Sequence, residues 1–413
     1  MNAISEIGAA GFLARYEASL GQLPGDSTLR AAAADAFRTS GLPGATRGRR
    51  AEAWKYTTLQ PLGGMSFRSS GPASAFDVPE VAPRIVFAGG QYRAELSTLV
   101  PSFARFADQP DFGELTWPDR DPMVALNTML AEDGAILTIP SGHDAGIVFL
   151  IHHGFPDTSA HPRHMIRLGN GARLTLMEMS GGEGSYLHNP VSEIHVADGA
   201  VLTHVRLQTE ATSAFHLATV YAAVAAGGTY DGFTLNIGGR ITRTEFHAAL
   251  NGPGATAHLN GAQLLTGSQH ADFTSVVRHA APKGTSRQTI KNVLAGHSRG
   301  VFQGRIEVAR GAQGTDGYQM NRALLLSPDA EIDTKPELEI FADDVKCSHG
   351  ATVGELDAEQ LFYLRSRGIP DSEARSILVR AFLAEALDPV TNDTARGLLE
   401  DAVARWWEGQ AAC

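Results

Sequence analysis

The sequence predicts a mainly β protein with a parallel β-helix core flanked by α-helical regions. Three observations lead to this prediction. Residues from about 80 to 345 form short β-type runs between glycine turns, a weak internal repeat recurs within them, and both ends of the chain show helical spacing instead. The 44 glycines in 413 residues also favour many short strands over long helices.

The repeat consists of short glycine-led segments. Residues 171–174 (GARL) resemble residues 199–202 (GAVL) and 254–257 (GATA), and more loosely residues 228–231 (GTYD), which gives steps of 28, 29 and 26 residues. One such unit cannot bury an apolar face alone, so neighbouring units must stack into a solenoid. A parallel β-helix is the first choice for these units, and a β-sandwich is the alternative.

At the N-terminal end, Asp26 or Ser27 is suited to begin a helix, apolar residues follow at helical spacing up to Phe37, and Gly41 ends it. The C-terminal end shows three helical segments. The first begins at a capping pair, Asp357 and Gln360. The second is predicted to carry on one face Ala374, Ile377, Leu378, Ala381 and Phe382, and the third Leu398, Leu399, Ala402, Val403 and Trp406.

We therefore expect three domains: an N-terminal helical region (residues 1–80), the β-helix core (81–350) and a C-terminal helical region (351–413). A β-solenoid also needs capped ends, because its terminal coils expose unpaired strand edges and apolar surface.

Composition excludes several classes of function. A formal net charge of -11 argues against nucleic acid as the main partner, since phosphate binding needs clustered Lys and Arg. No apolar run approaches the roughly 20 residues needed to span a bilayer. The first ten residues lack the basic start of a signal peptide, and the two cysteines, Cys347 and Cys413, lie far apart. We expect a cytoplasmic protein without disulfides.

Common catalytic motifs are absent: the sequence has no P-loop, no G-x-S-x-G elbow, no C-x-x-C and no H-E-x-x-H. A metal or proton-relay track is one interpretation of the histidines in the β region. We favour solvent-facing or hydrogen-bonded histidines, because no pair shows ligand spacing with a carboxylate or thiolate nearby. These histidines are His188, His195, His204, His216, His247, His258, His270, His279 and His297.

Two local motifs stand out. Cys347 and His349 are two residues apart, which in an extended strand places both side chains on one face, where they could share a soft metal ion or handle sulfur. Lys346 could lower the pKa of the thiol if it folds over it. An inert cysteine at a half-buried strand end is the equal alternative. Trp54, within a Trp-Lys-Tyr-Thr segment, is interpreted as an aromatic anchor that packs the N-terminal helices onto the β region.

These motifs resemble those of a known family. Residues 50–57 (RAEAWKYT) resemble the EAWKYT signature of SufD proteins, and residues 344–354 (DVKCSHGATVG) resemble their DVKCSHGAT-G signature. Residues 324–340 are similar to the family's LLLS and KPELEI stretches, and residues 361–375 to its FYL–RG–EAR helices. The paralogous SufB chains are typically longer and richer in cysteine, with an acidic residue where this chain has Ser348, so SufD is the better match.

The resemblance implies a right-handed parallel β-helix that pairs with SufB and docks a SufC ATPase on its C-terminal helices. It also implies that His349 and Cys347 lie near the SufB–SufD interface as candidate metal ligands, with a nascent iron–sulfur cluster shared transiently with SufB and none held by the isolated chain. A homodimer is possible for the chain alone. The candidate SufC-docking residues are Leu361, Phe362, Leu364, Ile377, Leu378 and Phe382.

We therefore expect a scaffold subunit rather than an enzyme. One rival is a polysaccharide lyase or hydrolase, but such enzymes present paired carboxylates, and Asp231 and Glu245 have no convincing partner in the sequence. The other rival is a SufB-like scaffold that ligates a cluster by itself. A single internal cysteine makes that difficult, because protein-held clusters generally need several thiolates.

Overall fold

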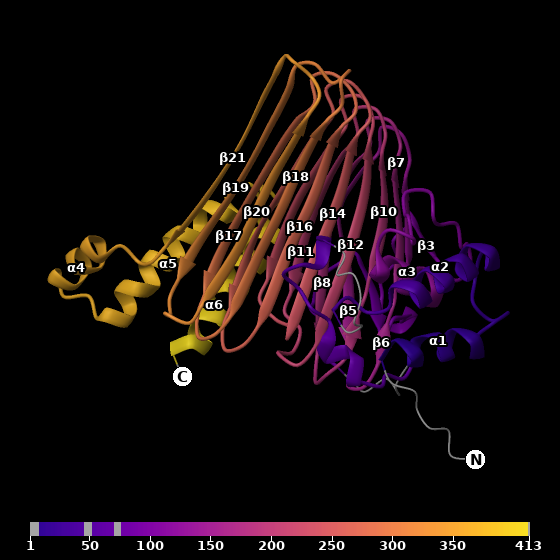
Figure 1. The fold of residues 1–413 in the computed structure, drawn as a ribbon, viewed down its shortest axis with the longest axis horizontal. Helices are drawn as coiled ribbons and strands as arrows, with labels where there is room; N and C mark the ends of the chain where they lie inside the picture. The colour runs from indigo at the N-terminus through magenta and orange to yellow at the C-terminus, as the bar shows by residue number, and fades with distance from the viewer. Residues whose placement is uncertain (1–7, 45–51, 70–75, 412–413) are drawn as a thin grey trace.

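The computed structural model describes residues 8–44, 52–69 and 76–411. Its centre is a solenoid in which each coil contributes a strand to each of two sheets (Figure 1). Strand pairing in the described residues is parallel except at the first coil, where β1 pairs with β2 and β3 with β4 in antiparallel fashion. The predicted mainly β protein with a parallel β-helix core and flanking helices is confirmed, and the β-sandwich alternative is wrong.

Within the described residues one sheet has ten strands. In spatial order they are β2 (Gln91–Tyr92), β1 (Arg84–Ala88), β5 (Asp144–Gly154), β8 (Arg173–Gly182), β11 (Val201–Gln208), β13 (Thr229–Asn236), β15 (Thr256–Leu265), β17 (Thr285–Leu294), β19 (Thr315–Leu325) and β21 (Val345–Gly354).

The second sheet has eleven strands in the same part of the chain. Its main path is β20 (Glu331–Ile340), β18 (Arg299–Val308), β16 (His270–His279), β14 (Ile241–Leu250), β12 (Phe215–Val224), β10 (Val191–Val196), β7 (Arg163–Leu168), β4 (Ala135–Ile139) and β3 (Phe103–Arg105). Two short strands, β6 (Ser159–Ala160) and β9 (Leu187–His188), pair beside this path, and β9 continues onto β12.

The repeat found in the sequence corresponds to the coils of the solenoid. Arg173, Val201, Thr229 and Thr256 pair in register at the starts of successive strands, with spacings of 28, 28 and 27 residues. The third unit was placed one residue late at Gly228, because the residue equivalent to Gly171, Gly199 and Gly254 is Gly227. All four have positive φ, between 60° and 70°, and each N–H donates to a carbonyl in the next coil. Such a backbone conformation favours glycine.

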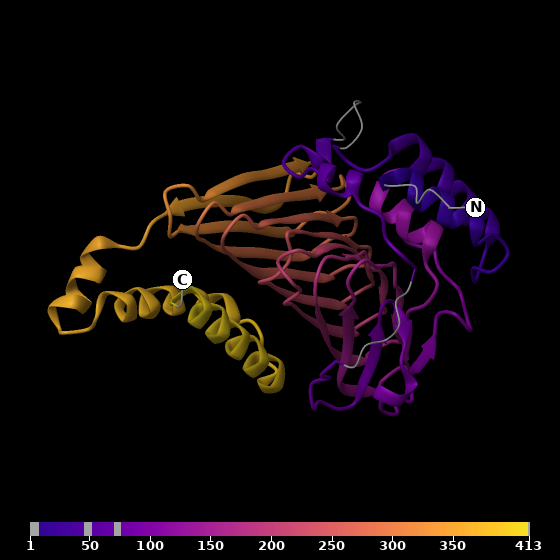
Figure 2. The ribbon, with the colours of Figure 1, turned by 90° about the horizontal axis from the view of Figure 1, so that it is seen from below.

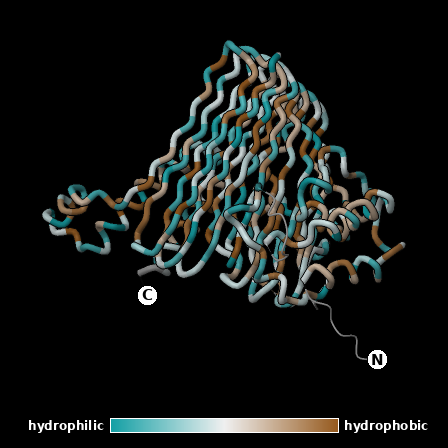
Figure 3. Tube along the Cα trace, in the orientation of Figure 1, coloured by the Kyte–Doolittle hydropathy of each residue, from teal (hydrophilic) through white to brown (hydrophobic). Residues whose placement is uncertain are grey.

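Aliphatic side chains fill the space between the sheets. One column runs through register-paired positions of eight strands of the second sheet, and hydropathy alternates along the strands as this packing requires (Figure 3). Its members are Leu137, Ile166, Ile194, Ala222, Ala248, Val277, Ile306 and Leu338. All but Leu338 in the last coil are buried, so each coil stabilises the interior of its neighbours.

The N-terminal helices pack on the second sheet. They are α1 (Gly8–Ala18), α2 (Ser27–Ser40) and, from inside the β region, α3 (Pro122–Leu130); short 3-10 helices lie at η1 (Glu52–Trp54), η2 (Gln60–Gly64) and η3 (Ala94–Leu96). Asp26 caps α2 by accepting from the N–H of Thr28, and Gly41 follows its last residue, as predicted. Phe12, Phe37 and Leu126 join Phe215 and Leu217 of β12 in one buried cluster.

The C-terminal helices are α4 (Ala358–Ser366), α5 (Asp371–Leu387) and α6 (Asp393–Ala411), on the other side of the solenoid from the N-terminal helices (Figure 2). Asp357 caps α4, and the predicted face of α6 is confirmed, with Leu399, Ala402, Val403 and Trp406 buried against the ten-stranded sheet. The predicted face of α5 is wrong. Its buried positions are Ala374, Ser376, Val379, Leu383, Ala386 and Leu387, whereas Ile377 and Ala381 are exposed.

The division into three domains stays a prediction. Two elements cross its limits: α3 lies inside the β region yet packs with α2, and β21 continues to Gly354.

The turn ladder predicts the cost of side chains at its positive-φ positions. Lys283 (φ 59°) stands in the turn that follows that of Gly254 (φ 70°), and its N–H donates to the carbonyl of Gln313 in the same way. A Cβ at Gly254 would meet no atom within 4 Å, so Gly254→Ala tests backbone strain alone. We expect it to lower the free energy of unfolding by about 1 kcal/mol, read as a lower urea midpoint.

The matched control is Gly311→Ala, at a glycine without positive φ and with open space around it. It should leave the midpoint unchanged or raise it slightly. Lys283→Gly should also not lower the midpoint, because about 1–2 kcal/mol of relieved strain outweighs about 0.5–1 kcal/mol of lost chain entropy. Equal midpoints for Gly254→Ala and Gly311→Ala would contradict this account.

Candidate functional site

The last coil of the solenoid is open. β20 and β21 are the final strands of their two sheets, and each pairs on one side only. Among the described residues no helix covers this end, because α5 packs on β15 and β17, on the outer face of the ten-stranded sheet. Ile340, Phe341 and Val353 are 39%, 66% and 55% exposed there. The need for capped ends that the sequence suggested is therefore not met here, and a free edge with apolar side chains remains.

Cys347 and His349 lie on the open strand β21 and share its inward-facing side, as their spacing predicts. Cys347 pairs in register with Gly317 and His349 with Gln319. Both partners are buried, and they alternate along β19 with the half-buried Asp316, Tyr318 and Met320. Because no further coil covers β21, the two side chains stand at the mouth of the solenoid interior.

The two side chains differ in environment. Cys347 is half-buried against Ile306 and Ala342, and burial, with a smaller contribution from the Asp316 carboxylate, raises the pKa of its thiol. The suggestion that Lys346 lowers the thiol pKa is wrong, since the pKa is raised and Lys346 is exposed. His349 is exposed to solvent. In the described part of the chain these two residues belong to no group of three or more metal-ligating side chains.

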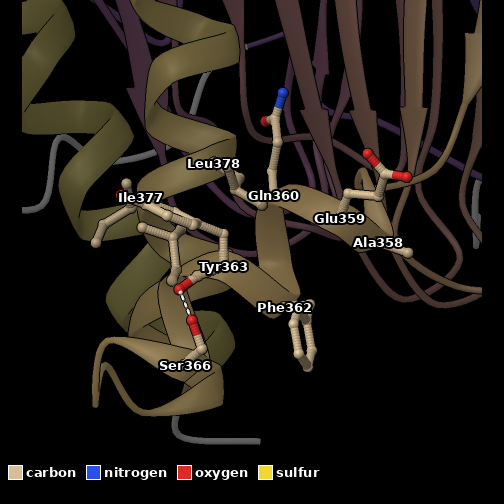
Figure 4. Close-up of a pocket in the computed structure, with 9 residues that line it drawn as sticks. Ala358, Glu359, Gln360, Phe362, Tyr363, Ser366, Ile377 and Leu378 are labelled. Carbon is tan, nitrogen blue, oxygen red and sulfur yellow. Dashed lines mark hydrogen bonds between the residues drawn. The ribbon is translucent and has the colours of Figure 1, made fainter.

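A second feature is a groove between α4 and α5, with a volume of about 880 Å³. No residue of α4 is buried, and Phe362 is 74% exposed. Figure 4 shows Phe362 projecting away from α5, while Tyr363 lies beside Ile377. Four of the six residues expected to dock the ATPase line this groove: Phe362, Leu364, Ile377 and Leu378.

The other two docking candidates lie elsewhere. Leu361 lines a neighbouring cavity of about 360 Å³ together with Leu326 and Leu356. Phe382 is half-buried against the solenoid: the Lys291 ammonium lies 4.6 Å from its ring centroid and donates to its backbone carbonyl at 2.6 Å. Phe382 therefore helps to attach α5 to the solenoid and does not belong to the groove.

Trp54 is an anchor, as its composition suggested. Its side chain is 4% exposed, and the Arg243 guanidinium lies 4.2 Å from its ring centroid. Thr57 donates a hydrogen bond to Asp272, which also pairs with Arg243. This network attaches residues 52–57 to β14 and β16; Arg50 and Ala51 of the same motif, like Cys413, lie outside the described residues.

The carboxylates considered for a lyase do find partners. Asp231 lies 3.4 Å from His258, and Glu245 accepts from Arg243 and His247 at 2.8 and 2.9 Å. Glu245 also lies near Asp121: burial and the Glu245 charge raise the pKa of Asp121 to about 6. Asp121, however, accepts from the N–H groups of Met123 and Val124 at the start of α3. Capping and ion pairing thus account for both carboxylates.

The histidines gave the main surprise. His188, Glu210 and His216 come together in the buried interior, with their potential ligand atoms within 4.8 Å of one another. The statement that no histidine pair has a carboxylate nearby is therefore wrong. His188 and His216 are 28 residues apart but occupy the same register position in adjacent coils. The coil length was the only available signal for this cluster.

These features define a class: a β-solenoid protein whose open last coil presents a thiol and an imidazole. Residues 150–382 match the family model described as "SUF system FeS cluster assembly, SufBD core domain". The iron–sulfur cluster assembly protein SufD of Escherichia coli is 33% identical over 86% of this chain and 88% of its own length. A SufBD family protein of Synechocystis is 31% identical over 86% of both chains, and protein ABCI7 of Arabidopsis thaliana is 32% identical over 74% of this chain and 66% of its own.

The chain therefore belongs to the SufD family of SUF iron–sulfur cluster assembly proteins. Its role lies in iron–sulfur cluster assembly. None of the helices described here is both long and apolar enough to cross a bilayer.

Proposed function

We propose that this chain is a cytoplasmic scaffold subunit, not an enzyme, that pairs with a SufB paralogue, docks a SufC ATPase and supports iron acquisition and cluster assembly at the SufB–SufD interface. The observation that carries the proposal is the open last coil with Cys347 and His349 at its mouth. A β-solenoid with a free strand edge offers backbone donors and acceptors that a strand of a similar protein can satisfy.

The edge of β20 supports pairing through the backbone. Glu331 and Phe341 donate their N–H groups to β18, so by the alternation of a strand the N–H groups of even-numbered residues point to the free edge. Pro336, which lacks an N–H, occupies one of these even positions. The earlier candidate segment, residues 338–345, covers only the end of β20 and the start of β21, so we extend the proposed pairing surface to both strands.

The nascent cluster would be transient and shared. Cys347 provides a single thiol at this end, whereas protein-bound clusters generally need several thiolates. An exposed neutral imidazole is a good iron ligand, and SufB would supply the remaining ligands. The isolated chain then holds no cluster and, with its edge unsatisfied, can pair with a second copy of itself.

The α4–α5 groove supports ATPase docking. Exposed Phe362, Tyr363 and Ile377 form an apolar surface at the tip of the C-terminal region, away from the solenoid (Figure 1). Apolar surface of this kind marks a protein interaction site when it is contiguous. Because α5 and α6 cover the ten-stranded sheet, point substitutions on α4 test docking without uncovering the sheet.

The first prediction concerns the edge. Ile340→Pro removes an N–H that points to the free edge and leaves the ladder to β18 intact. We expect affinity for SufB to fall by about fivefold, as for one lost hydrogen bond. Ile340→Ala is the matched control, since it shortens the side chain but keeps the N–H. If both variants bind SufB as the unmodified chain does, measured by isothermal titration, the partner strand lies elsewhere.

The second prediction concerns the cluster. His349→Ala should leave SufB and SufC binding intact and reduce iron and acid-labile sulfide per purified complex, because one cluster ligand is lost. Cys347→Ser should have a milder effect, because the half-buried thiol supports the site without being required as a ligand. Ser348→Ala, on the opposite side of β21, is the matched control. Full cluster content in the His349→Ala complex would show that this motif is structural.

The third prediction concerns the ATPase. Phe362→Ser and Ile377→Ser should each weaken SufC binding by roughly tenfold or more, the effect of losing about 1.5 kcal/mol of apolar burial. Leu99→Ser is the control, because Leu99 is 86% exposed on a different part of the surface. Pull-down and titration with purified SufC measure the effect. Unchanged binding by both groove variants would exclude the groove as the docking site.

A further inference from the structure

The interior of the solenoid contains a buried polar cluster that the proposed function does not use. His188 on β9 and His216 on β12 are paired in register one coil apart. Glu210, which follows β11, reaches the same corner of the coil. The exposed fractions of these residues are 4%, 1% and 2%. Two imidazoles and one carboxylate thus share a site from which water is largely excluded.

The carboxylate of Glu210 lies between the two rings. Its Oε1 is 3.0 Å from Nδ1 of His188, and its Oε2 is 2.8 Å from Nδ1 of His216. The Gln208 amide also donates to Oε2 at 2.8 Å. In a tetrahedral metal site with bonds of 2.0–2.1 Å, the ligand atoms lie about 3.3 Å apart. A separation by a few tenths of an ångström would therefore admit an ion.

Independent observations indicate that hydrogen bonds alone do not complete this cluster. Nδ1 of His216 is close to the carboxylate but lacks the angles of a hydrogen bond, so this buried atom has no hydrogen-bond partner among the described residues. The same holds for Nε2 of His152 and the hydroxyl of Tyr186. Unpaired buried polar atoms are costly, and they commonly mark an unmodelled ion or water.

A small void lies beside the cluster. It is lined by His152, Tyr186 and His188, among others, and its volume of about 10 Å³ is close to that of one water molecule. The ring centroids of His152 and His188 are 5.0 Å apart. One side of the His188–Glu210–His216 group therefore has room for a solvent ligand or a fourth side-chain donor.

We propose that His188, Glu210 and His216 form a binding site for one divalent first-row transition-metal ion inside the solenoid. Two imidazoles and one carboxylate form the ligand set of many Zn²⁺ and non-haem Fe²⁺ sites. Each imidazole can use its Nδ1 lone pair once the ring proton resides on Nε2. This site is separate from the Cys347–His349 pair at the open coil and does not depend on the proposed function.

The experiment measures metal in the full-length chain. The protein is expressed with added Zn²⁺ or, under anaerobic conditions, with added Fe²⁺, then washed with chelator and quantified by plasma mass spectrometry. We expect about one ion per chain in at least one of the two preparations; the two arms identify the metal. Less than about a tenth of an ion per chain in both preparations overturns the proposal.

Variants locate the ion. His216→Gln and Glu210→Gln keep side chains of similar size and should lower bound metal at least tenfold. Two controls should retain it: His279→Gln, at a buried histidine bonded to Ser286, and Cys347→Ser, which removes the thiol of the open coil. Retention by His216→Gln, or loss in Cys347→Ser, overturns the assignment.

X-ray absorption on the unmodified chain gives a readout that does not depend on the folding of any variant. We expect a nitrogen and oxygen shell at about 2.0–2.1 Å with imidazole scattering. A sulfur neighbour at about 2.3 Å would place the ion at Cys347 and overturn the proposal.

Discussion

The pairing of each coil's backbone with the next coil is the constraint on which the rest of this structure depends. From β5 to β19, every long strand of the ten-stranded sheet has a parallel neighbour on both sides. Variation in length between coils is therefore confined to turns, and the turn glycines recur at the coil spacing. Where the chain stops adding coils, at β20 and β21, backbone groups and interior side chains are left open together. The candidate site is a direct consequence of where the solenoid ends.

The same constraint controls the interior. A side chain at a given coil position lies against residues about one coil away in sequence, so chemistry is assembled between distant residues. Ile166 and Ile194 meet in this way within the apolar column, and His188 and His216 meet in the polar corner. Polar groups are costly inside a core unless they are paired. Glu178 satisfies this requirement, because His204 and Arg206 from the next coil both donate to it.

The sequence predicted what is local and missed what depends on register. Asp26, Gly41 and Asp357 indicated helix ends because caps act within one turn, and the Cys347–His349 spacing indicated a shared face because strands have a period of two. The face of α5 was wrong because Ile377 and Leu378 fit a helical stripe as well as Val379 and Leu383 do, and only packing against the sheet separates them. The Glu210 cluster required a coil spacing correct to the residue, and the repeat was one residue out at Gly228.

The two candidate surfaces are also mechanically linked. Lys291 of β17 bonds to the carbonyl of Phe382 and to the carboxylate of Glu385, both on α5. Arg322 of β19 lies 3.4 Å from the same carboxylate, and β19 is the strand that pairs with β21. Since burying an ammonium without its partners is costly, α5 cannot shift without breaking these bonds or moving the strands that carry them. The α4–α5 groove therefore rests on a helix that is attached to the last two coils of its sheet before the open strand, while α4 itself remains uncovered.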